Sequence, residues 1–219
     1  MPIAKVRQTS VPALAEGAAA DIRVNRRGEA VAMDWNASLV LEGKVYTANA
    51  GSISAPVTLV GTAIVVRRPQ LAVKVPTSAI TIIPLYMALY FETQGGAGIQ
   101  EVCFSTCQND IGRTNGTAVT PVNANTAKIA VATACQVDSI YSGDSAAYIS
   151  SMEFFRSGYP TDGSLTLTPR PLYEWSILVQ GNVPVLTGPA SLIISSGAAT
   201  SQTGFVTITW AEFLTAEIA

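Results

Sequence analysis

A stretch without a single charged residue runs from Trp175 to Ala211. Glycines and prolines divide this stretch into short segments rich in β-branched and aromatic residues, and such segments are typical of β-strands. The predicted strands are residues 172–180, 190–196 and 204–213. Three strands without charged side chains form a sheet with little to make either face soluble in water. We therefore expect a second sheet to cover one face and a neighbouring chain to cover the other.

The strand pattern continues through the rest of the chain from Leu39 onward, with turn residues at regular spacing and no sustained helical periodicity. Only Trp210–Ile218 fits a short helix as well as it fits a strand. The further predicted strands are residues 39–47, 57–66, 71–75, 80–92, 100–105, 127–134, 146–155 and 164–168. This pattern predicts an all-β fold, an antiparallel two-sheet sandwich that is jelly-roll-like.

The most apolar segment is residues 80–92, which alternates after Pro84. The alternation places one row of apolar side chains on one face and a second row on the other, so both faces need cover. We predict a central strand with Pro84 at its entry or at a bulge. The two predicted rows are Leu85, Met87, Leu89 and Phe91 on one face and Tyr86, Ala88 and Tyr90 on the other.

The N-terminal residues 1–35 form a predicted arm, and residues 36–219 form the sandwich domain. Within the arm, Ile22–Val24 and Glu29–Val31 flank a turn that ends at Gly28, which predicts a small hairpin. A two-stranded hairpin is marginal in water, so we expect it to dock on its own body or on a neighbour.

The charge is unevenly distributed along the chain. Residues 1–74 carry nine basic and five acidic residues, a net charge of +4, whereas residues 75–219 carry four and ten, a net of −6. We therefore expect the N-terminal part to contact an acidic partner. Nucleic acid is a poor candidate, because the arm offers only Arg23, Arg26 and Arg27 and no longer basic run.

The equipment for common catalysis is absent from the sequence. The chain has no histidine, which excludes Ser-His-Asp and Cys-His triads and histidine-containing zinc sites. It also has no nucleotide-binding or nucleophile-elbow motif. The loop carboxylates Asp110, Asp138, Asp144 and Asp162 are interpreted as turn residues. The sequence thus predicts a protein that is not an enzyme and has no catalytic residue, cofactor or metal site.

Three cysteines, Cys103, Cys107 and Cys135, follow a start that lacks an apolar signal segment. We therefore expect synthesis in a cytoplasm and reduced, buried and inert thiols rather than a metal or redox site. The longest apolar run, residues 75–91, is short and contains two prolines, so no membrane association is predicted.

Two segments carry a family resemblance. Residues 14–31, a glycine-containing lead-in followed by the hairpin, resemble a segment near the N-termini of tailed-bacteriophage virion proteins. Residues 204–212 are similar to the final strand of many such proteins. The resemblance implies a jelly-roll cement or decoration protein on the outer surface of the phage head. It also implies synthesis in the host cytoplasm, and as partners the major capsid protein and copies of the chain itself, arranged as a trimer.

Under this hypothesis, the arm and the outward face of the uncharged strands make the contacts. The predicted interaction residues are Arg23, Arg26, Arg27, Trp175, Thr207, Thr209 and Trp210. Three alternatives stay open: a phage receptor-binding or fibre-head jelly-roll domain that binds glycan through loop aromatics, the jelly-roll shell protein of a small virus, and a carboxylate-dependent hydrolase.

Overall fold

The computed structural model of the chain describes residues 34–59, 61–93, 96–109, 116–144, 150–161, 172–198 and 202–218. The predicted hairpin and Arg23, Arg26 and Arg27 lie outside the described residues, as does the predicted strand 164–168. The long strands are β1 (Val45–Ala50), β3 (Leu71–Val75), β4 (Ile80–Thr93), β5 (Gly98–Cys107), β9 (Ser150–Thr161), β10 (Leu172–Ser176), β12 (Ala190–Gly197) and β13 (Gln202–Leu214).

Shorter elements complete the described part. The short strands are β2 (Val57–Leu59), β6 (Thr117–Val119), β7 (Val122–Asn123), β8 (Gln136–Ser139) and β11 (Leu186–Thr187). The helical segments are α1 (Trp35–Glu42), α2 (Ile177–Gln180) and the 3₁₀ turns η1 (Thr126–Lys128) and η2 (Thr215–Glu217).

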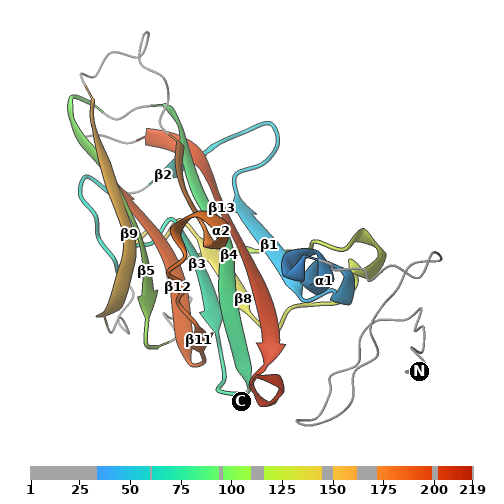
Figure 1. Cartoon of the computed structure of the whole chain (residues 1–219). Helices are drawn as coiled ribbons and strands as arrows, with labels where there is room; N and C mark the ends of the chain where they lie inside the picture. The colour runs from blue at the N-terminus through green and yellow to red at the C-terminus, as the bar shows by residue number, and fades with distance from the viewer. Residues whose placement is uncertain are drawn as a thin grey trace, which may run out of the picture.

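The strands form two sheets that pack face to face as a sandwich (Figure 1). The first sheet has seven strands, with the order β10-β4-β13-β1-β7 and with β11 and β2 paired to β4 and β13. The second has six strands in the order β6-β8-β3-β12-β5-β9. All pairings are antiparallel. The predicted all-β, antiparallel two-sheet sandwich is confirmed.

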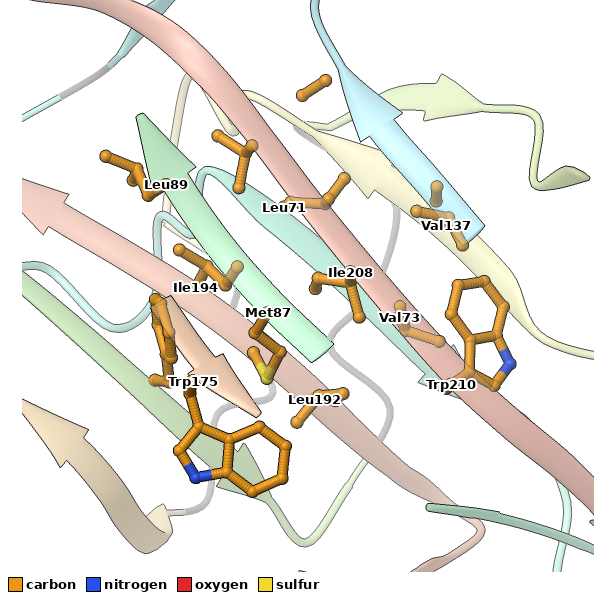
Figure 2. Packing of buried hydrophobic residues seen from close by; sticks show 14 of the residues in the cluster. Leu71, Val73, Met87, Leu89, Val137, Trp175, Leu192, Ile194, Ile208 and Trp210 are labelled. Carbon is orange, nitrogen blue, oxygen red and sulfur yellow. The ribbon is translucent and has the colours of Figure 1, made fainter. Parts of the chain in front are cut away.

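The core lies between the sheets and is built from the alternate residues of the central strands (Figure 2). Met87 and Leu89 of β4 and Ile208 of β13 point inward from the first sheet, and Val73 and Ile194 point inward from the second. All five side chains are fully buried. The burial of such side chains contributes about 1.5–3 kcal/mol each, so this layer holds the sheets together.

The alternation predicted for β4 is confirmed except at one residue. Met87, Leu89 and Phe91 lie in the core, and β4 is a central strand between β10 and β13. On β13, Thr209 pairs with Tyr86 of β4, but the next residue, Trp210, pairs with Pro84. One residue of β4 is therefore left without a partner, which confirms the predicted bulge at the proline. Leu85 is the extra residue, and it packs on the outer side of the sheet instead of in the core.

The predicted strand 39–47 is wrong in its first half, because α1 occupies residues 35–42. Gly43 ends this helix in the left-handed conformation with φ 76°, and its N–H and that of Lys44 donate to the carbonyls of Val40 and Leu39. Leu39 and Val40 of this helix are partly buried against the first sheet, and this packing outweighs the strand propensity of these residues.

Other predicted strands are wrong in position or length. Residues 127–134 hold η1 and a loop, because the Asn125 side chain caps the turn at Ala127, and the strand β8 follows instead. The predicted strand 172–180 ends at Ser176, whose hydroxyl caps α2. The strand predicted at 57–66 is confirmed only as far as Leu59. The strand predicted at 146–155 is confirmed for residues 150–155, which belong to the longer strand β9, and residues 146–149 lie outside the described residues.

Candidate interaction surface

The predicted interaction residues of the uncharged stretch divide between the core and the surface. Trp175 and Trp210 are 1% and 0% exposed and belong to the core between the sheets, so their prediction as interaction residues is wrong. Their rings are the largest apolar groups in the stretch, and their burial stabilises the sandwich. Thr207 and Thr209 alternate with core residues along β13 and point outward.

The outward face of the first sheet, which we call the Thr207 face, extends from β10 across β4 and β13 to β1 and β7. Register and alternation place on it Leu172, Glu174, Tyr86, Ala88, Tyr90, Thr93, Thr203, Phe205, Thr207, Thr209, Thr47, Asn49 and Val122. Glu174 is the only charged residue of this set. The strands β13 and β1 contribute none, so the middle of the face is a neutral surface of threonines and aromatic rings.

Hydrogen bonds between neighbouring strands hold the polar side chains of the Thr207 face in place. The hydroxyls of Thr47 and Thr209 lie 2.9 Å apart, and the Thr207 hydroxyl donates to Asn49 Oδ1 at 2.7 Å. The rings of Tyr90 and Phe205 stack with centroids 6.4 Å apart. Side chains that are already ordered lose less conformational entropy when a partner binds.

A shallow hollow of about 280 Å³ lies at the end of this face, where β1 leaves the sheet. Phe205 and Thr207 form one wall, and Ile53, which is fully exposed, lies on the other side. Gly51 has φ 102°, and a Cβ there would lie 2.8 Å from the Phe205 ring, so only glycine fits beside this ring. The hollow exposes apolar surface to a partner.

The opposite end of the Thr207 face is already covered by the chain itself. Leu39 and Val40 of α1 pack on Val45, Leu85 and Ala211. The Asn125 amide and the Lys128 ammonium donate to the carbonyls of Leu41 and Glu42, which fixes the helix beside β1 (Figure 1). The chain therefore enters the described part of the structure at the edge of this face.

The carboxylate at the β10 edge of the face is part of a polar pair. The Tyr86 hydroxyl donates to Glu174 Oε2 at 3.4 Å. Burial and the Glu174 carboxylate raise the pKa of Tyr86, so its hydroxyl keeps the proton that it donates. Glu174 remains exposed, so its charge is accessible to a cationic partner.

The outer side of the second sheet has a different character. There Lys74 Nζ lies 2.5 Å from Asp138 Oδ2, and both side chains are 1% exposed. Tyr141 and Ile193 form a small buried apolar cluster with Ala72, the residue that pairs with Asp138. Sequence reasoning did not predict this buried ion pair, because β3 and β8 are far apart along the chain.

The remaining residues that the sequence singled out do not assemble into a catalytic site within the described part of the chain. Asp138 pairs with Lys74, and Asp144 forms an ion pair with Arg68 at 2.5 Å. Asp110 and Asp162 lie outside the described residues. Among the described residues there is no cluster of three or more metal-ligating side chains, and no helix is long and apolar enough to cross a membrane.

The three cysteines are free and buried, as predicted. Burial raises the pKa of the Cys103 thiol to about 11, with a further contribution from Glu153. Burial and Glu212 likewise raise the pKa of Cys135. Thiolates are the reactive form of cysteine, so these two thiols are unreactive near neutral pH.

No family model, curated protein or solved structure matches the chain. The strand order of the sandwich and the Thr207 face are therefore the features that bear on function. The sequence identified Thr207, Thr209 and the outward pair Tyr86 and Tyr90 through period-two alternation. It missed Ile53, which lies in a short polar loop without any periodic pattern.

Proposed function

We propose that the protein is a structural subunit of a bacteriophage virion, a cement or decoration protein that binds the outer surface of the capsid. In this role, three copies of the chain form a trimer that binds the major capsid protein. The N-terminal arm and the Thr207 face make these contacts. It carries out no catalysis and binds no cofactor, nucleic acid or membrane.

The strand order is the observation that carries this proposal. Eight long strands run in the order β1-β13-β4-β10 in one sheet and β3-β12-β5-β9 in the other. When only these long strands are numbered along the chain, the first sheet has the order 1-8-3-6. The second sheet has the order 2-7-4-5. This order supports the assignment of the sandwich to the eight-stranded jelly rolls, a fold that occurs in viral capsid proteins as well as in lectin domains and cupins.

The Thr207 face supports a role in assembly over the other jelly-roll functions. A cupin site requires metal ligands or a cavity inside the barrel, whereas the space between these sheets is filled by apolar side chains such as Met87 and Ile208. A neutral surface with ordered threonines and stacked aromatics fits a protein interface, since charged residues are depleted at interface centres.

The test is the binding of purified protein to capsids that lack it, measured by co-sedimentation. The full chain is expected to saturate the capsids, and a chain without residues 1–30 is expected to bind far more weakly, because each subunit loses one of its linked contacts. Circular dichroism and urea unfolding serve as controls that the truncated chain is folded.

Two results would contradict the proposal. The first is full occupancy of the capsid by the truncated chain, which would remove the arm from the account. The second is failure of the intact chain to bind any capsid together with binding to a glycan array, which would favour a receptor-binding domain.

A further inference from the structure

We propose that the side chains of Lys74 and Asp138 condense after folding to an amide, an isopeptide bond between Lys74 Nζ and Asp138 Cγ. The bond joins strand β3 covalently to β8 on the outer side of the second sheet, away from the Thr207 face. This inference goes beyond the proposed function, because it assigns a modification site that does not depend on what the protein binds.

The two strands hold the reacting groups in contact. In the antiparallel pairing of β3 with β8, Ala72 lies opposite Asp138 and Lys74 lies opposite Gln136. Lys74 and Asp138 are therefore diagonal neighbours on one face of the sheet. Lys74 Nζ lies 2.5 Å from Asp138 Oδ2. Since the carboxyl carbon is one bond farther, Nζ lies within about 4 Å of Cγ, close to the separation of about 3–3.5 Å from which bound reactants combine.

The strands on either side fix both backbones. β3 lies between β8 and β12, and β8 lies between β3 and β6. Well-oriented groups within one molecule react as if each were present at about 10⁵–10⁸ M. The fold therefore supplies the proximity and orientation that an amine and a carboxyl group lack in free solution.

The pair is closed off from water. Both side chains are 1% exposed, and the neighbouring cluster of Ala72, Tyr141 and Ile193 is buried as well. Asp138 Cβ and Tyr141 Cζ lie 2.9 and 3.0 Å from the position that a Cβ on Gly116 would take. The backbone at Gly116 therefore packs directly on the carboxyl side chain and the phenol ring, and the chain covers the pair at this point.

Burial changes the balance between the ion pair and the amide. In water, hydration of the ammonium and the carboxylate favours the separate charged groups. A buried pair has lost this hydration, and an uncharged group in the same place avoids the cost of desolvating two ions. The water that condensation releases leaves for the solvent. The amide is therefore favoured at this pair, whereas an exposed lysine and carboxylate keep their hydration and stay separate.

The reaction needs no further reactant. One proton passes from the Lys74 ammonium to Asp138 Oδ2 across their contact, which gives a neutral amine and a carboxylic acid. The amine lone pair then forms the Nζ–Cγ bond. A second proton moves from Nζ to Oδ2, and the Cγ–Oδ2 bond breaks to release one water molecule. No group is oxidised or reduced.

Condensation at an unactivated carboxyl group is slow compared with folding, which small domains complete within about a second. A newly folded chain therefore carries the ion pair, and the amide accumulates with time. The stability of the ion pair itself is measured on newly folded protein.

The experiment follows the full-length chain by peptide mass spectrometry, directly after refolding and after a week in the folded state. We expect a branched peptide that joins the residues around Lys74 to those around Asp138 and is lighter than its two parts by one water molecule. Trypsin should no longer cleave after Lys74. The urea midpoint of the linked chain should rise by about 1 M or more, because the bond closes a long loop in the unfolded chain, as a disulfide does.

The chain contains a matched control. Lys44 Nζ lies 3.0 Å from Glu217 Oε2, but these side chains are 29% and 33% exposed, so this pair is expected to stay unlinked. The chain incubated in urea should link neither pair, because unfolding separates β3 from β8. The variant Lys74→Met/Asp138→Leu lacks both reacting groups and should yield no branched peptide.

The branched peptide is the deciding signal. A loss of water from the intact mass is not sufficient, because an Asp-Gly sequence such as Asp162–Gly163 also loses water when it forms a cyclic imide. Absence of the branched peptide after a week in the folded state would overturn the inference. Equal linking of Lys44 to Glu217 would overturn it as well, because burial would then play no part. If the bond forms but the protein binds no capsid, the inference holds and the proposed function fails.

Discussion

The buried pair of Lys74 and Asp138 gives a quantitative prediction about stability. Their charged atoms lie 2.5 Å apart at 1% exposure, so neither side chain reaches bulk water. Removing one partner of a buried ion pair typically costs about 3–5 kcal/mol, because the other charge stays buried without it. We therefore expect Lys74→Met to lower the free energy of unfolding by about 3–5 kcal/mol, and Asp138→Leu to do the same.

The double variant Lys74→Met/Asp138→Leu separates the loss of a contact from the cost of a buried charge. Replacing both charges with apolar groups removes the desolvation penalty, and the neighbouring Tyr141 and Ile193 already form an apolar surface. The double variant is therefore expected to recover most of the stability that each single variant loses, with a coupling energy above about 2 kcal/mol.

Urea unfolding followed by tryptophan fluorescence measures these differences. With a slope of about 1–3 kcal/mol per molar urea, a loss of about 4 kcal/mol shifts the midpoint by more than about 1 M. A single variant that loses less than about 1 kcal/mol would refute the reasoning, because it would mean that water reaches the pair in the folded protein. Additive single effects would refute it as well.

Three further predictions concern the surface, the thiols and one turn. Thr207→Lys is expected to impair self-association, measured by light scattering, and to change the free energy of unfolding by less than about 0.5 kcal/mol. The control Thr117→Lys should alter neither quantity. Normal self-association of Thr207→Lys would show that this face is exposed to solvent in the assembled protein. Because the pKa of Cys103 is about 11 in the folded protein against 9.0 in a model thiol, only the unfolded chain ionises between these values. Stability should therefore fall as pH rises from about 9 toward about 11, and Cys103→Ser should weaken that fall; an equally steep fall in the variant would contradict it. Gly51→Ala is expected to destabilise the protein by at least about 1 kcal/mol in urea unfolding, since φ is 102° and the Phe205 ring blocks a Cβ; an unchanged midpoint would be inconsistent with this turn.

The sequence predicted those parts of the fold in which the local pattern and the burial agree. Residues 71–75 and 190–196 were located almost to the residue, because both β-strands are apolar and end at prolines or glycines. Of the Thr207 face, the sequence predicted the outward positions of Thr207 and Thr209 and the row of Tyr86, Ala88 and Tyr90. The tryptophans were misassigned because the lack of charge in their stretch was taken as the sign of an interface, and composition alone cannot tell which face of a strand is the core.

Other features depend on contacts that are distant along the chain. Residues 35–42 form a helix because Leu39 and Val40 pack on strands far away in sequence. The ion pair of Lys74 and Asp138 arises because β3 pairs with β8 across a long connection. The order of the strands in the two sheets likewise depends on which strands pair, and no single segment specifies it.

Electron microscopy of phage particles that contain the protein is the most direct test of the proposed function. The account predicts density for the sandwich on the outer surface of the head, repeated around local threefold positions, with the N-terminal segment leading to the shell or to a neighbouring subunit. Density for the sandwich confined to the tail or its fibres would contradict it.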